Sequence, residues 1–129
     1  MRILLDTHAV IWWVDQDGLL SLASHAAIAD PANELLVSAA TVWEIAIKLG
    51  IARLSLVGAV STVDEPGAGR LTKRQFFPSR WSTRRGRWEL PNHHRDPFDR
   101  LLIAQALVED VPVVSADTTF EQYGVKRIW

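Results

Sequence analysis

Short apolar runs alternate along the chain with amphipathic stretches. Four of the runs are typical of short buried strands: Arg2–Leu5, Glu34–Ser38, Val111–Ser115 and Lys126–Trp129. Between them, apolar residues at helical spacing predict helices over residues 8–14, 21–30, 39–49 and 97–109. Because strands and helices alternate, we expect an α/β fold in which helices flank both faces of a short parallel sheet.

Residues suited to helix ends support these bounds. Thr7 and Ser21 are the expected N-caps of the first two helices. Asp96 is the expected N-cap of the last helix, with Pro97 at its first position. Gly50 is the expected C-cap of the helix over residues 39–49.

The composition is that of a globular chain with one core. Of 129 residues, 48% are apolar and 22% are charged, which suits a single domain over residues 1–129. No apolar run approaches the roughly 18 residues of a membrane span, and Asp6 comes too early for the apolar region of a signal peptide. The absence of cysteine excludes disulfides and thiolate metal sites, so a cytoplasmic protein without membrane contact is the simplest expectation.

The charge is distributed unevenly. The formal net charge is −1, whereas a protein that holds nucleic acid by neutralising phosphates is usually strongly basic. Seven of the fourteen Lys and Arg residues lie within residues 70–87, and residues 66–88 contain no acid. The stretch from about 58 to 89 also lacks clear periodicity. It is interpreted either as a basic substrate-facing loop or as a disturbed, poorly ordered piece of sequence.

Three acids lie where parallel sheets usually bind ligands, outside the carboxyl ends of the strands. Asp6 and Asp117 directly follow predicted strands, and Asp99 is in the first turn of the last helix on its apolar stripe, so it should point inward. Carboxylates that converge repel one another unless a cation lies among them. Oxygen-only ligands suit Mg²⁺, with Mn²⁺ as an alternative, and this arrangement is typical of metal-assisted phosphodiester hydrolysis.

Each acid also has a purely structural interpretation. An Asp after a strand is commonly a helix cap or turn former, and Asp96 is better explained as an N-cap than as a ligand. Glu44 lies off the stripe formed by Val42, Ile45, Ala46 and Leu49, which indicates a solvated residue paired with Lys48.

Two pairs of adjacent residues, one of histidines and one of tryptophans, could also bind a metal ion or nucleic-acid bases. His93 and His94 are adjacent, and adjacent residues rarely point to one ion, so a histidine metal site is not favoured. Trp12 and Trp13 are interpreted as core or partner interface rather than as a platform for bases.

Four segments together resemble one known family, the PIN-domain ribonucleases of the VapC toxin group in type II toxin–antitoxin systems. They are Met1–Ala9 with Trp12-Trp13; Val37–Lys48; His93–Ala106; and Val114–Asp117 with Phe120, Tyr123–Val125 and Trp129. The resemblance covers residues 1 to about 57 and about 90 to 129, and the segments occur in the family's order.

The resemblance implies a PIN-like three-layer sandwich with a site of four acids: Asp6, Glu44, Asp99 and Asp117. It implies that one or two Mg²⁺ ions are held mainly by Asp6 and Asp99, and that water activated by the metal attacks an RNA phosphate in line. Thr7, Asp96 and Ser115 are the neighbours implied to steady the acids or their water. A cognate antitoxin and a homodimer are the implied protein partners.

The resemblance stops between about residues 58 and 89. The family has a helix, a strand and an Ala-rich helix there, whereas this chain has Phe76-Phe77-Pro78 near the strand position and Trp81–Trp88 in place of the Ala-rich helix. Genuine divergence and a compensated pair of frame shifts are both open explanations. The alternative function is therefore a catalytically impaired PIN-like module that binds antitoxin or RNA without cleaving. A phosphatase with an Asp nucleophile is disfavoured because His8 stands where its second Asp is needed.

Overall fold

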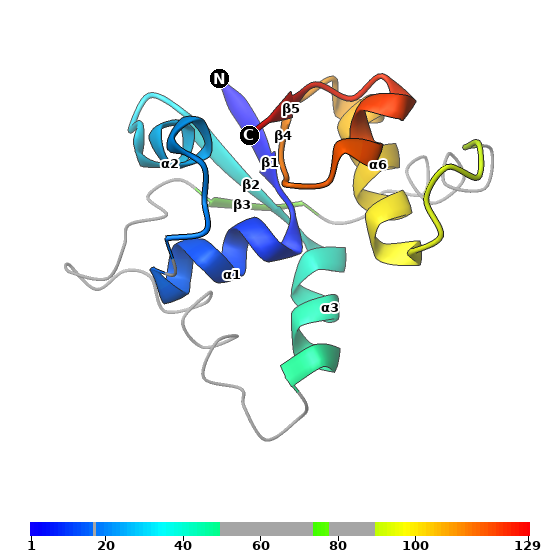
Figure 1. Cartoon of the computed structure of the whole chain (residues 1–129), viewed down its shortest axis with the longest axis horizontal. Coiled ribbons are helices and arrows are strands. Elements are labelled where there is room, and N and C mark those ends of the chain that lie inside the picture. Colours follow the sequence, from blue (N-terminus) through cyan, green and yellow to red (C-terminus); the bar gives the residue numbers. More distant parts are fainter. Residues whose placement is uncertain (17, 50–73, 78–89) are drawn as a thin grey trace.

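The computed structural model describes residues 1–16, 18–49, 74–77 and 90–129. Within these residues, five parallel strands form one sheet in the order β3-β2-β1-β4-β5 (Figure 1). The elements in chain order are β1 (Arg2–Leu5), α1 (Thr7–Asp15), α2 (Leu22–Ala29), β2 (Glu34–Ser38), α3 (Ala39–Leu49), β3 (Arg74–Phe77), α6 (Pro97–Glu109), β4 (Val113–Val114), the 3₁₀ helix η2 (Thr118–Tyr123) and β5 (Arg127–Ile128).

The register of the sheet places the ends of the strands together. Leu5 of β1 is paired with Val37 of β2 on one side and with Val114 of β4 on the other. All of these pairings are parallel, so the carboxyl ends of β1, β2 and β4 meet at one edge of the sheet. The residues that follow these strands are therefore neighbours, although they are far apart in the sequence.

Alternation along the central strands gives the sheet two apolar faces. On one face, Ile3 and Leu5 of β1 belong to a buried cluster with residues of α1, α2 and α3. On the other face, Leu4 of β1 packs with Leu102 and Ile103 of α6. Helices therefore cover both faces, with α1 and α2 to one side of the sheet and α6 to the other (Figure 1). This is the predicted α/β class.

Most of the expected bounds agree with the structure. The strands β1 and β2 and the helices α3 and α6 begin and end where the apolar pattern predicts. The predicted strand over Val111–Ser115 is shorter, since only Val113 and Val114 form β4. Ser21 and Asp96 are N-caps as expected, because their side chains accept hydrogen bonds from backbone amides of the first helical turn.

The predicted N-cap of α1 was wrong by one residue. Asp6, not Thr7, caps this helix, since the side chain of Asp6 accepts from the amide of Ala9, and Thr7 is already helical. A carboxylate at this position accepts an otherwise unpaired amide N–H and interacts well with the positive end of the helix. Thr7 is thereby left to make a long-range contact with Glu44.

Some sequence-based expectations lie outside the described residues. They include the C-cap at Gly50 and most of the stretch from about 58 to 89, of which only β3 (Arg74–Phe77) is described. The position of β3 agrees with the strand expected near Phe76 and Phe77. No helix in the described part of the chain is long and apolar enough to span a membrane.

Candidate metal centre at the carboxyl edge of the sheet

Asp6 lies directly after β1 and is almost completely buried, with 5% of its surface exposed. Its Oδ1 accepts the amide N–H of Ala9 at 2.6 Å, and its carboxylate also hydrogen bonds with the hydroxyl of Ser115. Burial raises the pKa of Asp6, the two hydrogen bonds oppose this rise, and the nearby charge of Glu44 adds to it. The ionised carboxylate is therefore held in place at an electrostatic cost that a cation would relieve.

Glu44 is on the buried side of α3, which corrects the expectation of a solvated residue. It is 4% exposed, whereas Ala46, assigned to the apolar stripe, is exposed. Its Oε2 accepts the hydroxyl of Thr7 at 2.5 Å, and its Oε1 lies 2.5 Å from the ammonium nitrogen of Lys48. The predicted pairing with Lys48 is therefore present, but at a buried carboxylate. The hydrogen bond with Glu44 raises the pKa of Lys48.

Asp96 and Asp99 both lie at the start of α6, Asp96 at the N-cap and Asp99 in the first turn, and they have different roles. Asp96 is the N-cap, and its Oδ1 accepts the amides of Phe98 at 2.8 Å and of Asp99 at 3.4 Å. The side chain of Asp99 is 26% exposed. Burial, together with the charges of Asp96, Glu44 and Asp6, raises the pKa of Asp99 to about 6, against the lowering effect of His94. Asp99 is thus electrostatically linked to both Asp6 and Glu44.

Asp117 follows β4 and is the N-cap of η2. Its Oδ1 accepts the amide of Thr119 at 2.8 Å, and its own amide donates to the hydroxyl oxygen of Ser115 at 3.1 Å. Burial acts to raise the pKa of Asp117, but hydrogen bonds from Thr119 and His94 outweigh it and hold the pKa below its usual value. Ser115, which is fully buried, therefore contacts Asp6 and the backbone of Asp117 at once.

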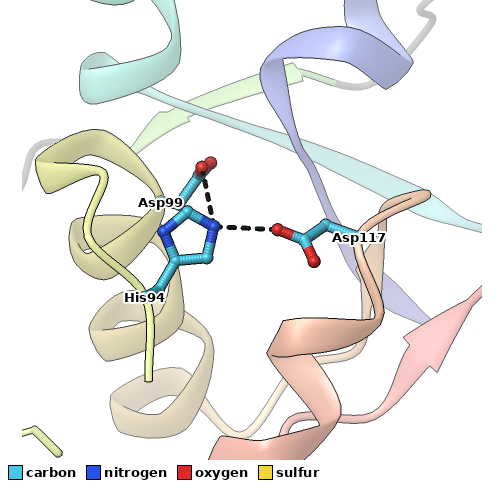
Figure 2. Close-up of side chains that lie close together, drawn as sticks. All are labelled: His94, Asp99 and Asp117. Carbon is cyan, nitrogen blue, oxygen red and sulfur yellow. Dashed lines mark hydrogen bonds and ion pairs between the residues drawn. The ribbon is translucent and has the colours of Figure 1, made fainter. Parts of the chain in front are cut away.

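His94 lies in the middle of this cluster, where the sequence did not predict a site residue. Its Nε2 is 2.8 Å from Oδ2 of Asp117 and 3.2 Å from Oδ2 of Asp99 (Figure 2). Within the described residues, His94, Asp99 and Asp117 form a group that offers three ligand atoms within 4.8 Å of one another. His93 does not share this environment, since it is exposed and its ring stacks edge-on against Tyr123.

A signal for His94 was present in the sequence but ambiguous. His94 is two residues before the N-cap Asp96, and a side chain at this position can contact the first turn of the helix. Nothing local distinguishes His94 from His93, because the contact with Asp117 joins residues 23 positions apart. Only the meeting of α6 with the end of β4 selects one of the two.

The cluster has the donor chemistry of a site for a hard divalent cation. Its acids come from the ends of β1 and β4 and from α3 and α6, and two of them, Asp6 and Asp99, have raised pKa values because of burial and mutual repulsion. Oxygen ligands of this kind suit Mg²⁺ or Mn²⁺. The residues therefore fit the cation that the sequence led us to expect, and the ammonium of Lys48 is paired with one of the acids, Glu44.

The tryptophan pair lies in a different part of the molecule. Trp13 packs against the core on the α1 and α2 side, and the ring of Trp12 lies between those of His8 and Trp129. Both line a cavity of about 280 Å³ together with Gln16, Gly18, Leu20 and His25. No acid of the candidate metal centre lines this cavity, and the interpretation of Trp13 as a core residue is supported.

Fold and site together define a parallel α/β protein with a centre of carboxylates at the edge of its sheet. The amino-acid sequence matches the PIN domain family over residues 3–126, and the chain belongs to that family. A comparison with curated proteins found no match.

Several solved structures share the fold. VapBC2 from Rickettsia felis, bound to a DNA fragment from its promoter, is similar with a TM-score of 0.70 and 10% identity over 100% of both chains. FitAcB from Neisseria gonorrhoeae has a TM-score of 0.62 and 20% identity, covering 97% of this chain and 95% of its own. FitAB bound to an IR36 DNA fragment has a TM-score of 0.64 and 16% identity, covering 97% and 92%.

Proposed function

We propose that this protein is a metal-dependent endoribonuclease and the toxin of a toxin–antitoxin pair. The observation that carries the proposal is the meeting of Asp6, Glu44, Asp99 and Asp117 with His94 at one edge of the sheet, in a chain of the PIN domain family. Buried carboxylates that repel one another are unfavourable without a cation, so a bound metal ion best accounts for this arrangement of acids.

We assign Asp6 and Asp99 as the principal metal ligands, with Glu44 and Asp117 assisting. The cation, Mg²⁺ or Mn²⁺, would supply charge stabilisation at the phosphate and a more acidic water. Ser115 holds the carboxylate of Asp6, and the amide of Ala9 fixes the same side chain from the helix. These contacts limit the movement of Asp6, which keeps its oxygens available in one orientation.

The remaining residues of the centre have supporting roles. Thr7 donates to Glu44 and so orients a carboxylate that comes from another element. Asp96 begins α6 and thereby sets the position of Asp99, consistent with a structural role at this acid. The proposed reaction is hydrolysis of an RNA phosphodiester, in which the chain's own contribution is to orient the acids around the cation that would keep them ionised.

The partner in this proposal is a cognate antitoxin. Support comes from the VapC resemblance and from the folds shared with VapBC2 and FitAB, whose structures contain DNA fragments. A homodimer, a single-domain organisation and a cytoplasmic location belong to the same proposal. Sedimentation of the purified protein tests the dimer directly: a monomer at micromolar concentration contradicts that part.

The direct test is RNA cleavage by the purified protein. We expect cleavage of a mixed cellular RNA pool with Mg²⁺, loss of cleavage with EDTA, and its return when Mg²⁺ is restored in excess. Asp99→Asn serves as the inactive variant, and Asp15→Asn, an exposed acid on α1 outside the centre, as the matched control. RNA binding without cleavage under all these conditions would instead favour a PIN-like module that binds RNA but does not cut.

A further inference from the structure

The ring of His94 is held by contacts at both of its nitrogens. The backbone amide of Asp96 donates to Nδ1 at 3.0 Å, and Nε2 lies within hydrogen-bond distance of Asp117 and Asp99. The ring also lies edge-on to Phe120, with the ring centroids 6.4 Å apart. Figure 2 shows the ring between the two carboxylates, one from α6 and one from the segment before η2.

These contacts determine which nitrogen carries the proton. A backbone amide N–H only donates, so Nδ1 must present its lone pair to Asp96. The neutral ring then carries its proton on Nε2, which faces two carboxylate oxygens that accept. His94 is thus oriented as a hydrogen-bond donor toward the acids, and its Nε2 lone pair is not available to a cation.

The backbone of His94 is held as well. Its amide donates to the hydroxyl oxygen of Tyr123 at 2.7 Å, and its carbonyl accepts from Nη1 of Arg100 at 3.3 Å. For Nε2 to bind a metal, the proton would have to move to Nδ1, where it would face the N–H of Asp96. That rearrangement gives up the hydrogen bonds to Asp96 and Asp117 and the close contact with Asp99 for one coordination bond.

We propose that His94 is a positioning residue that joins Asp99 to Asp117 through its Nε2–H, and that it is not a metal ligand. The inference rests on the proposed metal centre and deepens it. Although His94, Asp99 and Asp117 have the spacing of a mixed nitrogen and oxygen metal site, the centre offers only oxygen ligands. His94 sets the separation of Asp99 and Asp117, two acids that come from different elements and are far apart in the sequence.

The first test uses the protein without metal. Nitrogen-15 and proton NMR of the histidine rings at pH 7.5 in EDTA reports the tautomer of each neutral ring. We expect the His94 ring to carry its proton on Nε2, with a signal that disappears in His94→Gln. A ring with its proton on Nδ1 overturns the proposal, whether or not the protein binds metal or cleaves RNA.

The second test separates a positioning role from ligation and from packing. His94→Gln keeps an N–H near the position of Nε2, whereas His94→Asn keeps an acceptor for Asp96 and is too short to reach the acids. Calorimetric titration with Mn²⁺ should show about a ten- to hundredfold weaker affinity for His94→Asn and His94→Ala, with His94→Gln within about threefold of the unmodified protein. The same weakening in all three variants means that His94 acts only by packing and overturns the proposal.

Pulsed electron paramagnetic resonance of the Mn²⁺-loaded protein completes the test. We expect no coupling between Mn²⁺ and a directly bound nitrogen in the unmodified protein, and the same spectrum in His94→Gln. A nitrogen coupling that vanishes in His94→Gln would show that His94 is a ligand. Failure of the protein to bind Mn²⁺ at all contradicts the proposed metal centre, while the NMR result still decides the orientation of His94.

Discussion

The ammonium nitrogen of Lys48 lies 2.5 Å from Oε1 of Glu44, one helical turn earlier on α3. Glu44 is buried, whereas the side chain of Lys48 is 48% exposed, so the pair brings a solvated cation to a carboxylate that is almost fully buried. Asp96 and Asp99 add to the negative surroundings of Lys48. Lys48 therefore supplies part of the positive charge that the acids need, and a metal bound at the proposed centre would compete with it for Glu44.

Lys48→Met should make the metal-free protein less stable and increase its response to metal. Loss of the ammonium leaves Glu44 buried without its partner, which we expect to cost about 1–2 kcal/mol after allowance for the exposure of Lys48. Thermal denaturation with EDTA and with MgCl₂ measures both effects, and Lys126→Met, at an exposed lysine outside the centre, is the control. An unchanged metal-dependent rise in Tm would show that Lys48 and the metal do not compete.

The stability of the metal-free protein should increase as the pH falls from 7.5 to 5. The pKa of Asp99 is about 6 in the folded protein against an ordinary 3.8, so in this window the folded state binds protons that the unfolded state does not. Protonation of Asp99 in this window should stabilise the folded protein by roughly 1.5 kcal/mol, and the remainder of the effect appears only below pH 5. The raised pKa of Asp6 acts in the same direction. Urea denaturation in EDTA at the two pH values measures this difference.

The pH effect has its own control. Asp99→Asn should be more stable than the unmodified protein at pH 7.5. Its stability should rise much less between pH 7.5 and pH 5, since the titrating carboxyl is absent. Asp15→Asn should keep the gain. A gain that is equal in Asp99→Asn and in the unmodified protein means that other groups produce it.

Asp6→Asn and Asp99→Asn should each abolish Mg²⁺-dependent RNA cleavage without unfolding the protein. Both changes remove one of the repelling carboxylates, so the metal-free variants should be equally stable or slightly more stable. Circular dichroism and thermal denaturation confirm the fold before the nuclease assay is interpreted. Near-normal cleavage by either variant contradicts the assignment of Asp6 and Asp99 as principal ligands.

Asp96→Ala and Asp99→Ala should separate a structural acid from a functional one. Asp96 caps α6 through the amides of Phe98 and Asp99, so its loss should cost about 0.5–2 kcal/mol of stability. Asp96→Asn, which keeps an accepting oxygen, should recover most of that loss. RNA cleavage should fall much more in Asp99→Ala than in Asp96→Ala, and the opposite order would show that Asp96 is the ligand of the pair.

Short-range patterns were sufficient to predict much of the fold. The bounds of β1, β2, α3 and α6 follow from apolar runs and helical spacing, and the caps at Ser21 and Asp96 from residues within three positions. Asp6 and Asp117 were predicted at one edge because parallel strands align their carboxyl ends. These features depend on local backbone geometry, which a sequence records directly.

Other features were decided only when distant elements packed together. Periodicity placed Glu44 on the solvent side of α3, but Thr7 of the neighbouring helix contacts it across 37 positions of sequence and the residue is buried. Likewise, no local pattern distinguishes His94 from His93 until α6 and the end of β4 bring Asp99 and Asp117 to the same imidazole nitrogen. The sequence determines which acidic residues lie at the end of each strand. The burial and the contacts of a side chain also depend on other segments of the chain, and only the tertiary structure brings those segments together.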